Sequence, residues 1–219
     1  MGDKIPPTGP VSDDLWVLNF GFVSSYVLRA PQALAVFDTG LGAAAMEREL
    51  GRLGLSPEAV NAVFLTHSDG DHTGGLGAFP QAQVFLPRAE EPLIDGTTPR
   101  MFGFWKNSLK GRPYTPLDDG QKVELGPWTI ACLGTPGHTT GSMSYLIGGR
   151  FLIAGDILNL KKGRAVMDQG LLQMDKIKQL ASIFRLARLD HIEVLAAMHS
   201  GFTRDFAYAM DPWREEARP

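Results

Sequence analysis

Only one cysteine, Cys132, is present among the 219 residues of the chain. A single cysteine excludes an intramolecular disulfide framework and a zinc site built from several thiolates. The residue lies in an apolar run at 128–133, so we expect it to be a packed core side chain. The scarcity of cysteine also favours a reducing compartment.

The chain has neither an excess of positive charge nor a long apolar run. It carries 21 Lys and Arg against 24 Asp and Glu, a net charge of −3, whereas nucleic-acid-binding domains are usually basic. No stretch reaches the roughly 18 apolar residues that a membrane-spanning helix needs. The N-terminal M-G-D-K-I-P-P-T-G-P does not resemble a signal peptide. We therefore expect a cytoplasmic protein that acts on a small-molecule substrate, with no nucleic-acid or membrane partner.

What is present is the composition of a globular domain, with 44% hydrophobic and 21% charged residues. A chain of this size can bury one substantial core, so we expect a single domain over residues 1–219. Short apolar runs bounded by Gly or Pro predict strands. They lie at 14–20, 24–30, 33–40, 61–65, 82–87, 122–125, 128–133, 144–147, 150–155 and 192–197. The run 61–65 is typical of a strand buried on both faces.

Helical periodicity appears in two stretches, 43–53 and 174–188. In the first, Met46, Leu50 and Leu53 lie on one helical face. In the second, the apolar residues that line one face of an amphipathic helix are Met174, Ile177, Leu180, Phe184 and Ala187. Between the two, Ser56 is expected to be the N-cap of a helix with Pro57 at its first position.

Residues 66–75 read T-H-S-D-G-D-H-T-G-G and directly follow the apolar run 61–65. Two histidines and two aspartates fall within six positions: His67, Asp69, Asp71 and His72. Imidazole nitrogen and carboxylate oxygen are the usual ligands of zinc and non-haem iron. Because the cluster follows a predicted buried strand and ends in two glycines that permit a tight turn, it favours a metal-binding loop over a solvated one.

Three more candidate ligands each follow a predicted strand. His138 comes after 128–133, Asp156 after 150–155 and His199 after 192–197. Strand ends belong to a rigid scaffold and can bring residues that are distant in sequence to one edge of a sheet. The four segments together offer six or seven ligands, a number that suits two metal ions sharing a bridging carboxylate.

These motifs resemble the metallo-β-lactamase-fold hydrolases, a superfamily that includes glyoxalase II-like thioesterases and acyl-homoserine lactonases. The superfamily pattern is H-x-H-x-D-H, then G-H, then G-D, then a late histidine, and the resemblance extends roughly from Trp16 to Phe202. It implies an α+β fold, a four-layer αββα sandwich with metals at one edge. It also implies that Asp38, in F-D-T-G, supports the metal loop.

The resemblance implies two divalent metal ions, with zinc expected and iron or manganese as alternatives. It assigns His67, Asp69 and His138 to one ion, Asp71, His72 and His199 to the other, and Asp156 to a bridge between them. A metal-bound hydroxide would then cleave an ester, thioester, lactone or amide. Asp71 and Asp156 are the residues to which we assign direct catalytic roles, with Asp71 in proton transfer.

The departure from the superfamily pattern is Asp69, where histidine is usual. Three carboxylates against two divalent ions would make the site less electrophilic and raise the pKa of a bound water. An oxygen ligand also shifts preference toward manganese or iron. Two other interpretations therefore stay open: an iron-dependent enzyme that handles oxygen or sulfur, and a non-catalytic metal-binding scaffold.

Several residues are left with more than one interpretation. The aromatic segment 99–114 could line a substrate pocket, form a helix on the sandwich, or make an oligomer contact. Lys161, Lys162 and Arg164 are expected to be a solvated loop, with steering of an anionic substrate as the alternative. His191 has no motif partner and is expected at the surface. The sequence leaves the oligomeric state open.

Overall fold

The computed structural model of the chain describes residues 2–100, 106–168 and 170–215. Two sheets face each other in its centre. The first has seven strands in sequence order: β1 (Gly9–Pro10), β2 (Leu15–Asn19), β3 (Ser24–Ala30), β4 (Ala33–Phe37), β5 (Val60–Phe64), β6 (Gln83–Pro87) and β7 (Thr115–Leu117). The second has six: β15 (Gly201–Thr203), β14 (Val194–Ala197), β11 (Phe151–Ile153), β10 (Met143–Ile147), β9 (Trp128–Gly134) and β8 (Lys122–Leu125).

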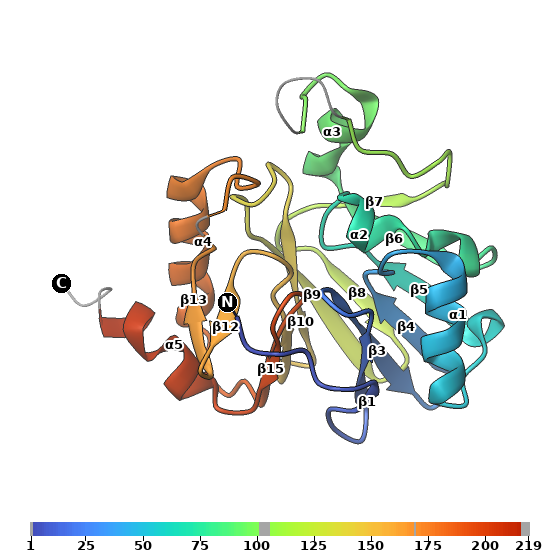
Figure 1. Cartoon of the computed structure of the whole chain (residues 1–219), viewed down its shortest axis with the longest axis horizontal. Helices are drawn as coiled ribbons and strands as arrows, with labels where there is room; N and C mark the ends of the chain where they lie inside the picture. The colour runs from blue at the N-terminus through green and yellow to red at the C-terminus, as the bar shows by residue number, and fades with distance from the viewer. Residues whose placement is uncertain (1, 101–105, 169, 216–219) are drawn as a thin grey trace.

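Helices cover the outer faces of both sheets. The helix α1 (Ala43–Arg52) lies outside the first sheet, and α4 (Lys176–Ala187) and α5 (Phe206–Glu215) lie outside the second (Figure 1). The remaining elements are short: α2 (Gly70–Thr73), α3 (Glu91–Asp95), the 3₁₀ turns η1 (Pro57–Ala59), η2 (Leu76–Ala78) and η3 (Arg88–Glu90), and the hairpin β12 (Asn159–Lys161) with β13 (Arg164–Val166). The fold is therefore the expected four-layer αββα sandwich.

Three hydrophobic clusters fill the spaces between the four layers, and strand alternation explains how. In β4, Ala35 and Phe37 belong to the cluster between the sheets, while Leu34 and Val36 belong to the cluster that also contains Met46 of α1. In β14, the residues likewise alternate between the central cluster and the cluster under α4 and α5. Successive side chains of a strand point to opposite faces, so a strand buried on both sides reads as a continuous apolar run.

Strand direction brings the candidate ligands to one edge of each sheet. In the second sheet, β9 and β11 are both antiparallel to β10, and β11 is parallel to β14. The carboxyl ends of β9, β11 and β14 therefore meet at the same edge, and His138, Asp156 and His199 follow them. In the first sheet, β4 and β5 are parallel, so Asp38 and His67 also emerge together.

All ten predicted strands and both predicted helices are confirmed, with bounds shifted by a few residues. The predicted face of α4 is wrong, because Ile177 is 82% and Leu180 37% exposed. The buried residues of α4 are Gln179, Ser182, Ile183, Leu186 and Ala187. Gln179 donates to the carbonyl of Ile157 at 3.0 Å and Ser182 to that of Pro136 at 2.8 Å. These polar side chains can be buried because they satisfy loop carbonyls, which apolar periodicity does not anticipate.

Ser56 is the N-cap residue with Pro57 at the first position, as predicted. The element that follows is only the three-residue 3₁₀ turn η1, and the Ser56 side chain makes no capping bond. Its hydroxyl donates instead to Glu58. At the other end of the chain, Trp213 anchors α5 by donating to the carbonyl of Ala165 at 2.8 Å. Among the described residues, no helix is long and apolar enough to cross a membrane.

Candidate metal centre

The loop between β5 and α2 is held by Asp38, which directly follows β4. Asp38 Oδ1 accepts the backbone N–H of Thr66 at 2.7 Å, and Oδ2 accepts the Thr66 hydroxyl at 2.7 Å. The same Oδ2 lies 2.8 Å from His72 Nδ1. Asp38 is fully buried, so the expectation that it supports the metal loop is confirmed. Its φ of 58° lies in the left-handed region, which Asp and Asn tolerate better than most residues.

Glycine allows this loop to pack closely against the turn after β4. A Cβ added to Gly75 would lie 2.1 Å from the carbonyl oxygen of Thr39, and one added to Gly74 would lie 2.5 Å from that of Leu41. The close approach lets the amide and the hydroxyl of Thr39 both bond to the carbonyl oxygen of His72, at 2.6 and 2.9 Å. The two glycines at the end of the motif therefore allow the bonds that fix the position of His72.

Four histidines converge with their Nε2 atoms toward one point. Each has its Nδ1 bonded to an oxygen: His67 to the Thr66 hydroxyl at 2.9 Å, His72 to Asp38, His138 to the side-chain carbonyl of Gln173 at 3.1 Å, and His199 to the Phe22 carbonyl at 2.7 Å. The carbonyl oxygens beside His138 and His199 and the carboxylate beside His72 can only accept, so these bonds place a proton on Nδ1, and Nε2 is the nitrogen that a metal can bind once it is deprotonated.

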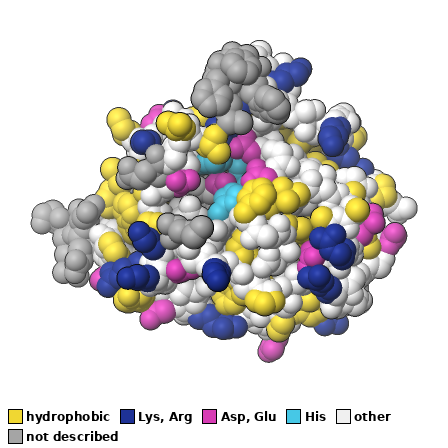
Figure 2. Space-filling view, viewed as in Figure 1, with side chains coloured by type: hydrophobic (Ala, Val, Ile, Leu, Met, Phe, Trp, Pro, Cys, Tyr) yellow, Lys and Arg dark blue, Asp and Glu magenta, His cyan; other side chains and the backbone are white. Residues whose placement is uncertain are grey.

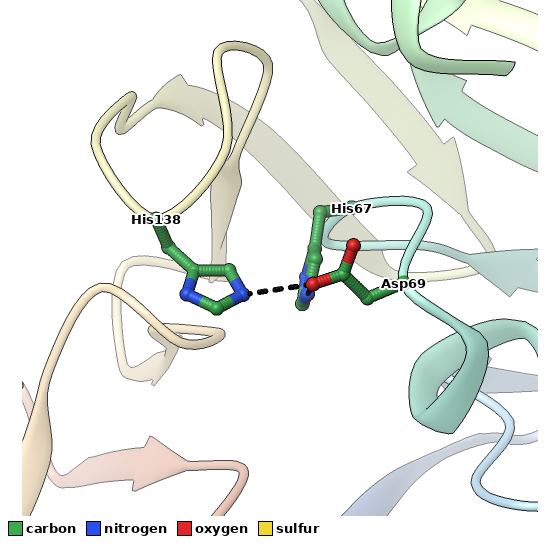
Figure 3. A group of neighbouring side chains, drawn as sticks. All are labelled: His67, Asp69 and His138. Atoms are coloured by element: carbon green, nitrogen blue, oxygen red, sulfur yellow. Dashed lines mark hydrogen bonds and ion pairs between the residues drawn. The ribbon is translucent and has the colours of Figure 1, made fainter. Parts of the chain in front are cut away.

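The tautomer of His138 is fixed by a chain of two bonds. The Gln173 amide nitrogen donates to Asp168 Oδ2 at 3.1 Å. A carboxylate only accepts, so the amide must turn its oxygen toward His138 Nδ1. Gly137 permits the loop to approach α4, since a Cβ there would lie 2.4 Å from Gln179 Cα. His138 thus reaches the site from a loop of the second sheet, opposite His67 and Asp69 (Figure 3).

Asp156 lies at the centre of the four histidines. Its Oδ2 is 2.9 Å from His199 Nε2, 3.3 Å from His72 Nε2, 3.6 Å from His138 Nε2 and 4.0 Å from His67 Nε2. Asp71 Oδ2 lies 3.5 Å from His199 Nε2 and 3.6 Å from His72 Nε2. On the surface, histidine and acidic side chains gather near the middle of one face (Figure 2).

The donor atoms fall into three overlapping sets, each within 4.8 Å: His67, Asp69 and His138; His67, His72 and Asp156; Asp71, His72 and His199. The first and third sets are the two ion positions expected from the sequence, and we call them the first and second positions. All seven predicted ligands therefore lie together, with Asp156 between the two positions.

Unpartnered buried atoms test whether the residues fit a metal ion. His67 Nε2, His72 Nε2 and Asp156 Oδ1 are buried and have no hydrogen-bond partner among the described residues. Leaving a buried polar atom unsatisfied costs about 1–3 kcal/mol. All three atoms belong to the set His67, His72 and Asp156. Imidazole nitrogen and carboxylate oxygen are the donor atoms that zinc, iron and manganese bind. The site fits a divalent ion.

The acidic and histidine side chains of the site stabilise one another's charged forms. Burial opposes a charged His72, but Asp156 and Asp38 outweigh it and raise the pKa of His72 well above its usual range. His199 is also partly buried, yet Asp156 raises its pKa to about 9. Burial would raise the pKa of Asp156, but His72 and His199 hold it well below its usual range. Asp69 has a lowered pKa for the same reason: the neighbouring His138, His67 and Arg100 outweigh the opposing effect of burial.

Two residues that the sequence analysis did not identify hold Asp69. Arg100 Nε lies 2.8 Å from Asp69 Oδ1, and Nη2 lies 2.6 Å from Oδ2. Asn107 donates to the same Oδ1 at 2.8 Å. The expectation of a site with one unbalanced extra negative charge is wrong, because Arg100 neutralises Asp69. The stretches that contain Arg100 (T-T-P-R) and Asn107 (K-N-S) have no motif that indicates a site. The two residues reach Asp69 only because of the path that the folded chain takes.

Glu90 is the third residue that the sequence did not reveal. It is fully buried and joins the two loops that carry His67 and His138. Its Oε2 accepts the backbone N–H of Ser68 at 2.8 Å, and its Oε1 accepts the backbone N–H of Gly141 at 3.0 Å. The hydroxyls of Ser68 and Thr139 also donate to it. Glu90 therefore fixes the separation of the two loops.

The other residues singled out from the sequence have simpler positions. Cys132 is buried in the central cluster, as expected, and burial raises the pKa of its thiol to about 12. His191 is exposed, as expected. Lys161 and Lys162 are exposed around the β12–β13 turn, and whether they steer a substrate stays a prediction. In the aromatic segment, Phe102, Phe104 and Trp105 lie outside the described residues, and 106–114 contain no helix.

The metallo-β-lactamase superfamily model matches residues 18–199, and the chain belongs to this family. A hydroxyacylglutathione hydrolase of Aeromonas hydrophila subsp. hydrophila is 28% identical over 193 residues, which are 85% of this chain and 65% of the relative. The chain therefore spans less than two thirds of that relative's length.

Solved structures agree on the fold. A metallo-β-lactamase family protein from Thermus thermophilus superposes with a TM-score of 0.72 at 26% identity, covering 94% of this chain and 80% of that one. The Rm3 metallo-β-lactamase superposes with a TM-score of 0.75 at 19% identity, covering 99% and 92%.

Proposed function

We propose that this protein is a metal-dependent hydrolase that cleaves an acyl bond of a small molecule, with a thioester as the first substrate class to test. The observation that carries the proposal is the convergence of four Nε2 atoms around Asp156, each histidine having its Nδ1 bonded to an oxygen. The thioester is favoured because the relative that matches 85% of this chain is named a hydroxyacylglutathione hydrolase. We also propose that the enzyme is cytoplasmic.

The seven residues have distinct roles in the proposed reaction. Two divalent ions, zinc being the first candidate, would supply an activated water and polarise the substrate carbonyl. Asp156 lies between the two positions and would hold both ions, since its carboxylate offsets their mutual repulsion. Asp71 Oδ2, 3.5 Å from His199 Nε2, would accept a proton from the attacking water and return it to the leaving group.

Apolar side chains at the site suit an acyl group. Phe22 is exposed, and its ring stacks parallel to His199 with centroids 6.0 Å apart. Leu172 is also exposed, and its carbonyl accepts a bond from Arg100 at 2.8 Å. The Phe22 ring thus adjoins a residue of the metal centre and offers an apolar surface to a substrate chain.

The test is a substrate panel on protein of measured metal content. Thioesters including a hydroxyacylglutathione, simple esters, lactones and β-lactams are assayed with zinc-, manganese- and iron-loaded protein, beside protein stripped of metal. We expect metal-dependent thioester hydrolysis that the Asp156→Asn variant lacks. Oxygen uptake by the iron form without hydrolysis would support the oxygen-handling alternative. Tight metal binding without turnover of any substrate would support the scaffold.

A further inference from the structure

Arg100 is almost completely buried beside the first ion position. Its side chain is 3% exposed, and its guanidinium is fixed on two sides. Nε and Nη2 form a bidentate pair with Asp69, at 2.8 and 2.6 Å, while Nη1 donates to the Leu172 carbonyl at 2.8 Å. A planar guanidinium held in this way is a rigid, permanent positive charge.

The same guanidinium also reaches a second ligand of the first position. Arg100 Nη2 lies 3.2 Å from His138 Nε2. The same Nε2 also lies 3.1 Å from Asp69 Oδ2. Arg100 therefore contacts both oxygens of Asp69 and the Nε2 of His138, which belong to two of the three groups that would hold the first ion.

The second position differs in this respect. Its members Asp71, His72 and His199 form no hydrogen bond with Arg100 among the described residues, and His199 Nε2 lies 2.9 Å from Asp156 Oδ2. An ion that enters the second position displaces no guanidinium. An ion that enters the first position must bind lone pairs of Asp69 and His138 that Arg100 already contacts. The metal ion and the guanidinium are both cations, so they repel each other.

We propose that Arg100 is a positioning residue that makes the two ion positions unequal: the second fills first, and the first binds its ion weakly because Arg100 competes for Asp69 and His138. This inference rests on the proposed metal site, although not on the reaction. Asn107 sharpens it, because its side-chain amide holds Asp69 Oδ1 and the Ser68 hydroxyl, both at 2.8 Å. Asp69 therefore keeps its orientation when Arg100 is removed, and only the competition is lost.

The experiment is a metal titration of wild type, Arg100→Met and Arg88→Met, each stripped of metal and titrated with zinc against a chelator of known affinity. Arg88 is the matched control, since it forms a bidentate pair with Asp118 at 2.9 and 3.1 Å on the surface. We expect wild type and Arg88→Met to bind one equivalent tightly and a second weakly. Arg100→Met should bind the second equivalent about 10–100-fold more tightly.

Two results would overturn the proposal. Equal, tight binding of two equivalents by wild type would show that Arg100 does not compete, and a weaker second equivalent in Arg100→Met would show that it supports the ligand instead. Failure of every variant to bind zinc would count against the proposed function itself.

A double variant covers the case in which Arg100→Met does not fold. Asp69→His with Arg100→Met exchanges an ion pair for two uncharged side chains, so the net charge is unchanged. We expect it to bind two tight equivalents, whereas Asp69→His alone leaves Arg100 buried without its carboxylate and should bind the second equivalent more weakly than wild type. Tight binding of two equivalents by Asp69→His alone would contradict the proposal.

Discussion

Glu90 Oε2 accepts the backbone N–H of Ser68 at 2.8 Å, and its other oxygen accepts that of Gly141 at 3.0 Å. One buried carboxylate thus spans the loops on either side of the metal centre, one from each sheet. A single side chain therefore sets how far apart the two loops lie.

The first prediction concerns this clamp. Glu90→Gln retains the size of the side chain but turns an amide N–H₂ toward groups that also donate, which should lower the free energy of unfolding by about 1–3 kcal/mol. Separation of the loops should also weaken metal binding. Urea denaturation and zinc titration measure the two effects, with Glu91→Gln, on the neighbouring helix α3, as the control. Unchanged stability and affinity would show that the clamp is redundant.

The second prediction concerns Asp38. Asparagine tolerates a φ of 58°, so Asp38→Asn changes the charge without straining the backbone. Loss of the carboxylate behind His72 Nδ1 should weaken zinc binding about 10–100-fold. The exposed Asp118→Asn variant is the control. If both variants bind zinc like wild type, then Asp38 contributes to the loop alone and not to the histidine ligand.

The third prediction concerns pH. The pKa of His199 is raised from 6.5 to about 9 by Asp156, so an ion that binds Nε2 below pH 9 must displace a proton. Zinc affinity should increase as the pH rises from 6.5 to 9, with release of the His199 proton and of the proton of His72, whose pKa is raised as well. Calorimetry in two buffers of different ionisation enthalpy counts the protons. Affinity that is independent of pH in this window would contradict the shift.

The same shift affects stability with a definite sign. The folded pKa of His199 exceeds its unfolded value, so its contribution is complete below pH 6.5 and is lost as the pH rises through about 9. Protein stripped of metal should therefore have a lower Tm at pH 9 than at pH 6.5. His199→Gln should reduce that difference, since glutamine does not titrate.

The fourth prediction separates ligands from other histidines and acids. Asp156→Ala should remove at least one ion and abolish turnover, because Asp156 lies between both positions. His191→Ala should leave the metal content unchanged, since His191 is exposed and belongs to none of the ligand sets. Metal analysis by mass spectrometry of both variants is the measurement. Equal loss of metal would mean that the ligand set is wrong.

The residues that the sequence could predict and those it could not differ in a physical way. His67, His138, Asp156 and His199 were recognisable because each follows an apolar strand, and strand direction alone brings such ends together. Ten strands were readable because alternate residues fill two clusters, which produces continuous apolar runs. The short strands β1, β7, β12, β13 and β15 were not predicted.

Arg100, Asn107 and Glu90 were not recognisable because they act through contacts made by irregular segments. No periodicity marks a residue whose role depends on where a loop passes. The buried face of α4 was missed for a related reason: Gln179 and Ser182 are buried because loop carbonyls accept their protons, and these carbonyls are known only once the fold is known. The charge at Asp69 was misjudged from sequence because its partner lies 31 residues away.

Anomalous diffraction from crystals of zinc-loaded protein would show whether these seven residues hold metal. We expect a strong zinc peak among Asp71, His72, His199 and Asp156, at about 2.0–2.2 Å from their donor atoms, and a weaker one among His67, Asp69 and His138. Absence of a peak from both positions, or a strong peak elsewhere on the molecule, would contradict this expectation.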